Sequence, residues 1–420
     1  MVWVIVLLAL LGAPIFSVFG GLSLHAYRTS GLDASLIVGE LSRLATMPLL
    51  QALPMFALAG YILAGSGAAQ RLLRVSRAAF GWLPGGLSVV ALLACTLLTS
   101  FTGASGVTIV ALGGLLLPAL LAEKYGDRYS LGLITNAGNL GVLFVPSLPL
   151  ILYAVIANQV SSEVTIDRLF KAAALPGILG LGFLSVYGVS YAVSHRVPRV
   201  PFSVKELLRA LWAARWEVPL PFVVLGGIYA GKLVVSEAAV MTAAYSLVVE
   251  VFIQREIRFR ALAKIVRDCT VLVGGVLIIL GMGMAMTNYL VDQEVPTKIF
   301  DVVQAHISSR LAFLLALNFF LLIVGCLMDI YTAIIVVVPL IIPIALRFGV
   351  NPVHMGVIFL ANLAIGYVTP PVGMNLFIAS IRFDKSVIEL SKASIPFILV
   401  LLAALAIITY VPALSLWLGG

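Results

Sequence analysis

The stretch AIGYVTPPVGMN, residues 364–375, interrupts an apolar run that is long enough to span a membrane. Two adjacent prolines and two glycines stop a helix there, because proline lacks a backbone N–H and clashes with the preceding turn. In hydrocarbon, the carbonyl groups freed by such a break have no water to bind. The stretch therefore predicts a helix that stops and restarts inside the membrane, with Pro370 and Pro371 as helix-breaking residues.

The composition of the chain is that of a membrane protein. Its 420 residues are 62% hydrophobic and 10% charged, and the mean hydropathy is +1.14. Apolar runs of about 18 residues or more recur along the chain, each able to cross about 30 Å of hydrocarbon. We predict an all-α polytopic membrane protein, and we interpret the first run, 2–20, as a mature helix rather than a signal peptide. The net charge of +8 indicates basic cytoplasmic loops rather than nucleic-acid binding.

The apolar segments repeat at an offset of 225 residues. LGGLLLPALL (112–121) aligns with VVPLIIPIAL (337–346), and NAGNLGVLFVPSLP (136–149) aligns with ANLAIGYVTPPVGM (361–374), which pairs Pro146 with Pro371. Internal repeats of this kind are typical of secondary transporters.

The predicted first inverted repeat, 1–195, has scaffold helices within 1–64, a hairpin at 83–122, a broken helix at 130–157 and a helix at 172–194. An amphipathic linker and a connecting helix occupy 196–233. The second repeat, 234–420, has a hairpin at 308–347, a broken helix at 355–381 and a helix at 393–417.

The distribution of Lys and Arg predicts the orientation in the membrane. With both hairpins re-entrant, one face carries 18 of the 26 basic residues, which assigns that face to the cytoplasm. The N-terminus is then cytoplasmic, the C-terminus is outside, and the two repeats are inverted. Hairpins that crossed fully would leave the sides unchanged, so both alternatives remain open. Within the linker, 203–216 predicts an amphipathic helix in the cytoplasmic interface, with a solvated connector as the alternative.

Two clusters interrupt the predicted hairpins at membrane depth. In TSFTGASGVT (99–108), glycines and hydroxyls break what would otherwise be a helix of about 40 residues, and the exposed oxygens suit Na⁺. The alternative is a Gly/Ser helix-packing surface. In GCLMDIYT (325–332), Asp329 lies between two apolar runs, where it could bind Na⁺ or a proton, or order the hairpin. The alternative is a loop tip exposed to water.

Two further clusters interrupt the predicted broken helices. TNAGNLGVLFVPSLP (135–149) places Asn136 and Asn139 on one face before Pro146, and the opening stretch contains Thr369. Each half-helix end carries about half an elementary charge, so N-termini attract anions and C-terminal carbonyls attract cations. A simple proline kink is the alternative. Because the second copy has Pro370 before Pro371 and the first has Val145 before Pro146, we predict tighter Na⁺ binding in the second.

The remaining polar residues exclude other chemistry. The four histidines, His25, His195, His306 and His354, lie in or near predicted loops without metal-ligand spacing, so we expect Na⁺ only and no transition metal. The sequence contains no GxxxxGK[ST] motif, so a gradient rather than ATP is the expected energy source. Glu237 is interpreted as a helix-start residue with Ser236 as the cap. Cys95, Cys269 and Cys326 indicate small apolar packing rather than a disulfide framework.

Taken together, these residues resemble the large (M) membrane subunit of the tripartite ATP-independent periplasmic (TRAP) transporters, in the ion-transporter superfamily. The markers are LLQALPMFALAGYILAGSG (49–67), TGASGVT (102–108), YSLGLITNAGNLGVLFVPSLPLILYAV (129–155), VSEAAV (235–240), NFFLLIVGCLMDIYTAIIVVVPLIIPIA (318–345) and GVIFLANLAIGYVTPPVGMNLF (356–377). The resemblance implies one Na⁺ site at Gly103, Ser105, Gly141 and Val145, and another at Gly325, Asp329, Gly366 and Thr369. It implies a substrate site between them, near Thr108, Asn136, Asn139, Thr332 and Asn375.

The resemblance also implies the activity. The expected function is Na⁺-coupled uptake of a small carboxylate-bearing organic acid across the bacterial inner membrane, by an inverted-repeat elevator and without a cofactor. The expected partners are a small four-helix membrane subunit (Q) and a periplasmic substrate-binding protein (P). One alternative is a stand-alone carrier or antiporter of the same superfamily. A channel and a membrane enzyme are less consistent with two broken-helix sites and an isolated Asp329, so we expect no enzymatic activity.

Overall fold

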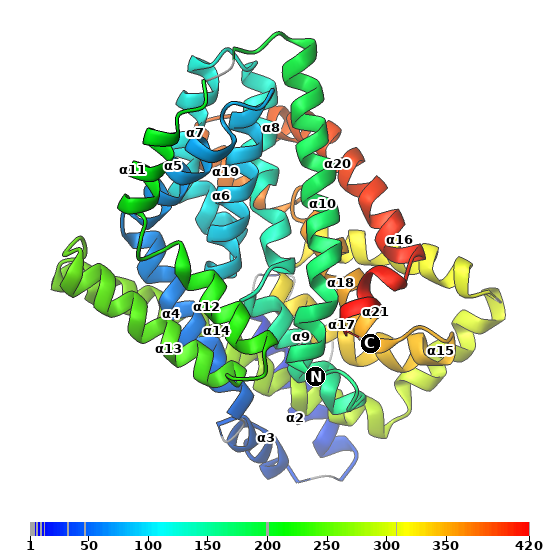
Figure 1. The fold of residues 1–420 in the computed structure, drawn as a ribbon. Coiled ribbons are helices and arrows are strands. Elements are labelled where there is room, and N and C mark those ends of the chain that lie inside the picture. Colours follow the sequence, from blue (N-terminus) through cyan, green and yellow to red (C-terminus); the bar gives the residue numbers. More distant parts are fainter. Residues whose placement is uncertain are drawn as a thin grey trace.

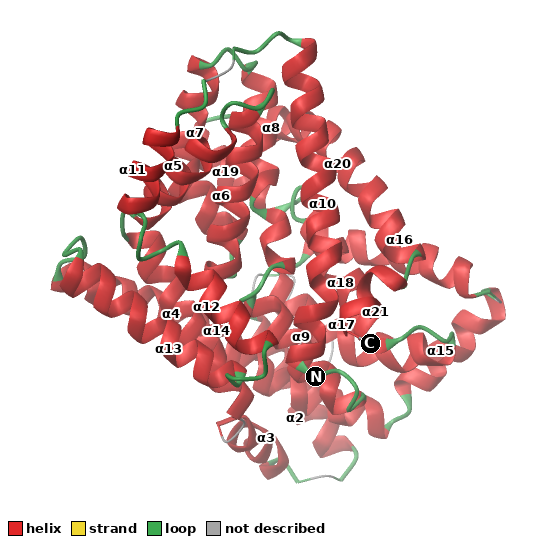
Figure 2. Cartoon of the chain, in the orientation of Figure 1, coloured by secondary structure: helices red, strands yellow, loops and turns green. Residues whose placement is uncertain are grey.

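The structure is a computed structural model that describes residues 5, 7–8, 11, 13–31, 33–45, 48–198, 201–307 and 309–419. Within these ranges the regular elements are all helices (Figure 2). Seven of them are long and apolar enough to cross a membrane, or nine if each of two bent pairs counts as one span. The prediction of an all-α polytopic membrane protein is confirmed. The predicted first apolar segment, 2–20, is described in part, and α2 begins at Ile15 within it.

Two helical hairpins form the middle of the molecule. The first consists of α6 (Gly86–Thr102) and α7 (Ser105–Ala122), and the second consists of α16 (Arg310–Leu327) and α17 (Ile330–Arg347). The bounds of α7, shifted by 225 residues, coincide with those of α17. Gly103 turns the first tip with φ +68°, a conformation that costs a residue without a Cβ little. The second tip turns at Met328 and Asp329.

Two discontinuous helices pack beside the hairpins. In the first, α8 (Asp127–Ala137) leads through the 3₁₀ turn η2 (Asn139–Leu143) to α9 (Leu148–Val160), with a bend of 41°. In the second, seven residues separate α18 (Pro352–Gly366) from α19 (Met374–Phe383). Pro146 lies in the first break, and Pro370 and Pro371 lie in the second. The predicted pair of discontinuous helices is therefore present.

A layer of helices supports the first hairpin from one side (Figure 1). The helices of this layer are α2 (Ile15–Thr29), α3 (Ser35–Ala45), the short η1 (Pro48–Gln51), α4 (Ala52–Gly65), α13 (Val235–Leu247) with its π-helical continuation η3 (Val248–Ile253), and α14 (Phe259–Asp292). Helix α4 packs on α13, α14 and α6, so it lies between this layer and the hairpin.

The chain bends by 74° between α4 and α5 (Ala68–Phe80). An ion cluster holds α5 just after this bend. Arg71 Nη2 lies 2.6 Å from a Glu217 carboxylate oxygen and 3.1 Å from one of Glu250. Arg71 Nη1 pairs with Glu256, whose other oxygen accepts from the Gly67 N–H. Because Glu217 and Glu250 are buried, the cluster fixes the start of α5 against the support layer.

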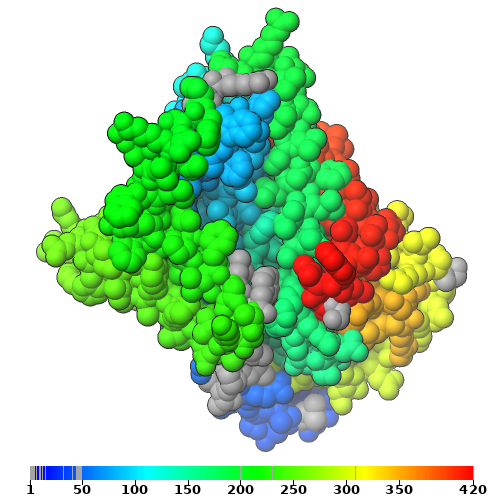
Figure 3. All heavy atoms as spheres, in the orientation of Figure 1, coloured from blue at the N-terminus to red at the C-terminus, as the bar shows by residue number. Residues whose placement is uncertain are grey.

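The remaining helices complete the molecule. They are α10 (Ile166–Ser194), α11 (Val204–Ala213), α12 (Pro219–Tyr229), α15 (Val295–His306), α20 (Val387–Tyr410) and α21 (Ala413–Gly419). In Figure 3 the C-terminal helices, coloured red, lie against α10, and packing between α10, α20 and α21 accounts for this. Helix α11 is amphipathic, as predicted, and it exposes Leu208 and Trp212 on its apolar side.

Several local predictions were wrong. The acidic stretch 291–301 was expected to form an outside loop, but α14 continues to Asp292 and α15 begins at Val295. Ser236 does not cap α13: the helix begins at Val235, and Glu237 accepts from the Val234 N–H at 3.1 Å. This bond does give Glu237 its predicted helix-start role. His354 does lie near a loop, in the first turn of α18, but it is fully buried, and Ser415 Oγ lies 3.1 Å from its Nδ1.

Candidate functional site

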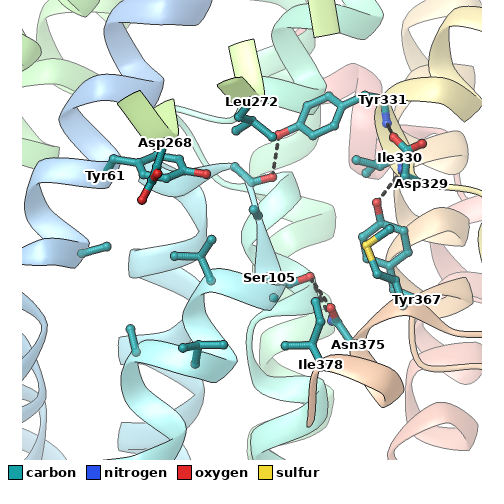
Figure 4. Close-up of a pocket in the computed structure, with 18 of the residues that line it drawn as sticks. Tyr61, Ser105, Asp268, Leu272, Asp329, Ile330, Tyr331, Tyr367, Asn375 and Ile378 are labelled. Atoms are coloured by element: carbon teal, nitrogen blue, oxygen red, sulfur yellow. Dashed lines mark hydrogen bonds between the residues drawn. The ribbon is translucent and has the colours of Figure 1, made fainter. Parts of the chain in front are cut away.

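A cavity of about 790 Å³ lies between the tips of the two hairpins (Figure 4). Its walls come from both hairpin tips, the first turns of α7 and α19, and residues of α4 and α14. This volume is in the usual range for small-molecule sites. Of the thirteen residues that the resemblance assigned to ions or substrate, Gly103, Ser105, Asp329 and Asn375 line it.

Asp329 orders the second hairpin. Its Oδ1 accepts from the backbone N–H groups of Tyr331 and Thr332, both at 3.0 Å, and so caps α17. Aspartate is among the preferred N-cap residues, because it satisfies N–H groups that the helix itself leaves unpaired. The charge at the tip therefore has a structural use that does not depend on bound ions.

Hydrogen bonds join the two hairpin tips to each other and to the second break. The Tyr331 hydroxyl donates to the Gly103 carbonyl at 3.0 Å, and the Ile330 N–H donates to the Tyr367 hydroxyl oxygen. The contact between Tyr331 and Gly103 crosses between the two repeats, which are far apart in sequence. The tips consequently form one side of a shared site.

Three polar side chains from different elements meet near the other side of the cavity. Asn375 Nδ2 on α19 donates to Ser105 Oγ at 2.9 Å and to Asn139 Oδ1 at 2.6 Å. All three residues are buried. This network links the first hairpin, the first break and the second discontinuous helix.

The glycines assigned to ion binding lie at close backbone contacts. A Cβ on Gly366 would lie 2.5 Å from the Gly325 carbonyl carbon, and one on Gly141 would lie 2.4 Å from Thr99 Cβ. Only a residue without a side chain allows this approach. Packing alone therefore requires glycine at these positions, whether or not the carbonyls also bind a cation.

The other assigned residues do not line the cavity, and all of them are buried except Thr369, which is half-buried. Thr108 shares a 2.6 Å hydrogen bond with Thr99, and Thr369 Oγ1 donates to the Ile365 carbonyl at 2.8 Å. Val145 is buried in the first break. Asn136 Oδ1 and Thr332 Oγ1 are buried without a hydrogen-bond partner among the described residues. Neutral oxygens of this kind are suitable ligands for a hard cation.

Sequence reasoning missed four polar residues that line the cavity: Tyr61, Asp268, Tyr331 and Tyr367. The sequence did not mark the tyrosines as site residues, because single aromatic residues are common in apolar helices. Asp268 lies near the start of a long apolar run, where a charge is normally interpreted as marking the helix end. Its direction toward the cavity depends on how α14 packs against α4.

The comparisons with known proteins identify the family. The family model described as "Tripartite ATP-independent periplasmic transporter, DctM component" matches residues 1–414. The chain belongs to this family. Two relatives in this family are named for different substrates. The isethionate TRAP transporter permease protein DctMQ of Oleidesulfovibrio alaskensis is 34% identical over 95% of this chain, which spans 63% of that protein's length. The C4-dicarboxylate large permease DctM of Pseudomonas aeruginosa is 34% identical over 88% of this chain and 87% of its own.

A solved structure supports the fold of this DctM family member independently. The Alcanivorax borkumensis YdaH transporter matches with a TM-score of 0.63, covering 91% of this chain and 87% of that one. Its sequence identity is only 16%, so the likeness concerns the fold alone.

Proposed function

We propose that this chain is the large subunit of a TRAP transporter and carries a small organic acid into the cell, driven by Na⁺. The observation that carries the proposal is the cavity between two hairpin tips, beside two broken helices. Interrupted helices at membrane depth are tolerated where they line a cavity or are buried in protein, and transporters use their free ends to bind ions and substrates. The proposed activity is transport rather than catalysis.

Na⁺ is the proposed coupling ion because the groups around the breaks are oxygens. In the first site, the carbonyls of Gly103, Gly141 and Val145 would act with Ser105. In the second, Asp329 and Thr369 would act with the carbonyls of Gly325 and Gly366. Asp329 uses Oδ1 for both capping bonds, which leaves Oδ2 for a cation. The unpartnered oxygens of Asn136 and Thr332 are further ligands, or contacts for the substrate, together with Thr108.

An elevator is the proposed mechanism. The hairpins and broken helices form the moving unit, and the layer containing α4 and α14 forms the scaffold. The two parts meet closely at Gly60 of α4, where a Cβ would lie 2.2 Å from the Phe101 carbonyl oxygen at the first tip. Small residues let backbones approach closely, and this close approach is the proposed sliding contact.

The proposed orientation follows from the basic residues. The cavity reaches Gly65 at the end of α4 and Asp268 near the start of α14. Those ends adjoin the segments that carry Arg71 and Lys264, on the face that the charge distribution assigns to the cytoplasm. We therefore propose that this is an inward-facing conformation in the bacterial inner membrane, with the N-terminus inside and the C-terminus outside.

The proposed partners follow from the family. A small four-helix subunit would support the scaffold layer, and a periplasmic binding protein would deliver the solute. A stand-alone carrier is the second candidate, because the fold also matches the YdaH transporter over most of the chain.

Uptake into proteoliposomes tests the proposal. The chain is reconstituted with a four-helix partner, the binding protein is added outside, and labelled organic acids are offered under an inward Na⁺ gradient. We expect saturable uptake that disappears when K⁺ replaces Na⁺ and when the binding protein is omitted. Na⁺-driven uptake without the binding protein would identify the stand-alone carrier. An uptake rate that is the same with and without Na⁺ would refute the proposed coupling.

A further inference from the structure

Two regions of the cavity differ in electrostatic character, apart from the hairpin tip, where Asp329, proposed above as a Na⁺ ligand, also lines the cavity. Ser105 and Asn375 form one side, and Asp268 on α14 lies across the cavity beside Tyr61 (Figure 4). Among the described residues that line the cavity, none is Lys, Arg or His. Carboxylates and neutral groups therefore determine which charges a solute can carry there.

The side formed by Ser105 and Asn375 is suited to an anion. Both are first-turn residues, of α7 (18 residues) and α19 (10 residues), and no side chain caps either helix. Both N-termini carry a partial positive charge, although the Asn375 N–H itself donates to the Tyr367 carbonyl at 3.0 Å. The nearby α17 differs, because Asp329 caps it.

A buried amide adds an independent indication of a ligand. Asn139 Nδ2 has no hydrogen-bond partner in the described part of the chain, although the residue is only 1% exposed. Its Oδ1 accepts from Asn375, so the unpaired NH₂ lies at the same network. An unpaired buried donor costs about 1–3 kcal/mol, and a carboxylate bound beside Asn375 would remove that cost.

The opposite side is suited to a cation. The Asp268 side chain is 42% exposed, and it points into the cavity (Figure 4). Arg267 Nε approaches it only to 3.9 Å, and the Arg267 side chain is 81% exposed, so solvent weakens that pair. A solute with two carboxylates would place its second negative charge toward Asp268.

We propose that the solute of this cavity is a zwitterionic organic acid, whose carboxylate binds at Ser105 and Asn375 and whose cationic group pairs with Asp268. This rests on the proposed transport function and specifies its substrate class. An ammonium, amidinium or quaternary ammonium group meets the requirement. Tyr61 beside Asp268 adds an aromatic face, which also attracts cations.

Two matched pairs of probes test the proposal. Glycine betaine and 3,3-dimethylbutanoate have the same shape and differ in the positive charge. γ-Aminobutyrate and glutarate differ in having an ammonium or a second carboxylate. Their affinities are measured by calorimetry on the full chain with its partner subunit in nanodiscs at saturating Na⁺, which avoids the selectivity of the binding protein.

The wild-type chain should bind the zwitterion of each pair about tenfold more tightly than its anionic match. Asp268→Asn should reduce this ratio to below about threefold, and Asp268→Glu should retain it. Asp292→Asn makes the same change on the same helix outside the cavity, and it should leave the ratio unchanged.

Three results would overturn the inference: an unchanged ratio in Asp268→Asn, tighter binding of the anions, or no binding of either zwitterion at 50 mM. Na⁺-driven uptake is measured in a separate experiment. Na⁺-driven uptake of a dicarboxylate would keep the proposed function and refute the zwitterion. Zwitterion binding that depends on Asp268, without Na⁺-driven uptake, would refute the function and keep the site.

Discussion

Two glycine-to-alanine variants distinguish a fixed contact from a sliding one. A Cβ on Gly366 would lie 2.5 Å from the Gly325 carbonyl carbon and 2.6 Å from its Cα. Both glycines belong to the unit that moves as one body in the proposed elevator. Backbone atoms cannot rotate away as a flexible side chain does, so Gly366→Ala should cost about 1–3 kcal/mol of unfolding free energy.

Gly60 makes an equally close contact, but between the scaffold and the moving unit. Its Cβ would lie 2.2 Å from the Phe101 carbonyl oxygen and 2.7 Å from Thr102 Cα. Gly60→Ala should raise the free energy of this conformation by a similar amount, about 1–3 kcal/mol. If the two parts slide, another conformation relieves the clash, and the population shifts away from this one by about 5- to 150-fold.

Two measurements separate these outcomes. Thermal unfolding reports stability, and the labelling rate of a Val110→Cys reporter in the cavity by an impermeant maleimide reports conformation in proteoliposomes. Gly366→Ala should lower the unfolding midpoint and leave labelling unchanged. Gly60→Ala should slow labelling from the cytoplasmic side with little change in midpoint. Gly182→Ala, where a Cβ meets nothing within 4 Å, is the control. Equal loss of stability in both variants with unchanged labelling would refute sliding at Gly60.

The remaining predictions concern charge and hydroxyl groups. Asp329→Asn keeps a cap for α17, so it should change the unfolding free energy by less than about 1 kcal/mol. It should nevertheless abolish Na⁺-driven uptake. Near-normal uptake at low Na⁺ would exclude the carboxylate from coupling. Thr369→Ala should raise the Na⁺ concentration for half-maximal uptake, and an unchanged Na⁺ titration would remove Thr369 from the site. Arg71→Gln leaves the buried Glu250 without its cation and should cost about 3–5 kcal/mol in denaturant unfolding. The exposed pair of Arg74 provides the matched variant Arg74→Gln, which should cost less than about 1 kcal/mol, and equal losses would contradict the importance of burial.

The hairpins and broken helices were predictable because hydrocarbon imposes strong rules on sequence. A membrane helix needs an apolar run of fixed length, so an interruption such as 364–375 is visible without any knowledge of the fold. Helices outside those rules were missed: α5 and α15 carry too many polar residues to register as apolar runs. Length and hydropathy detect spans but not amphipathic connectors, and of these helices only α11 was predicted, from the spacing of its apolar residues.

The arrangement of the site was less predictable than its members. Ser105 and Asn375 are 270 positions apart and share a hydrogen bond, and nothing local in either segment indicates that pairing. Asp329 was expected to bind an ion or order the hairpin, and the structure shows the ordering bonds directly. Tertiary packing determines which polar groups face one another, and a single sequence does not contain that information.

Tighter Na⁺ binding at the second break stays a prediction, and burial is a physical argument against it. The prolines favoured the second break, where Pro370 follows Thr369. Pro370, Pro371 and Val372 are exposed, however, whereas Val145 and Pro146 in the first break are buried. A cation bound to carbonyls loses affinity where water competes, since exposed charges interact in a high dielectric. Packing of α6 and α10 against η2 encloses the first break, and Na⁺ titrations of variants at the two breaks would decide which of them binds the ion more tightly.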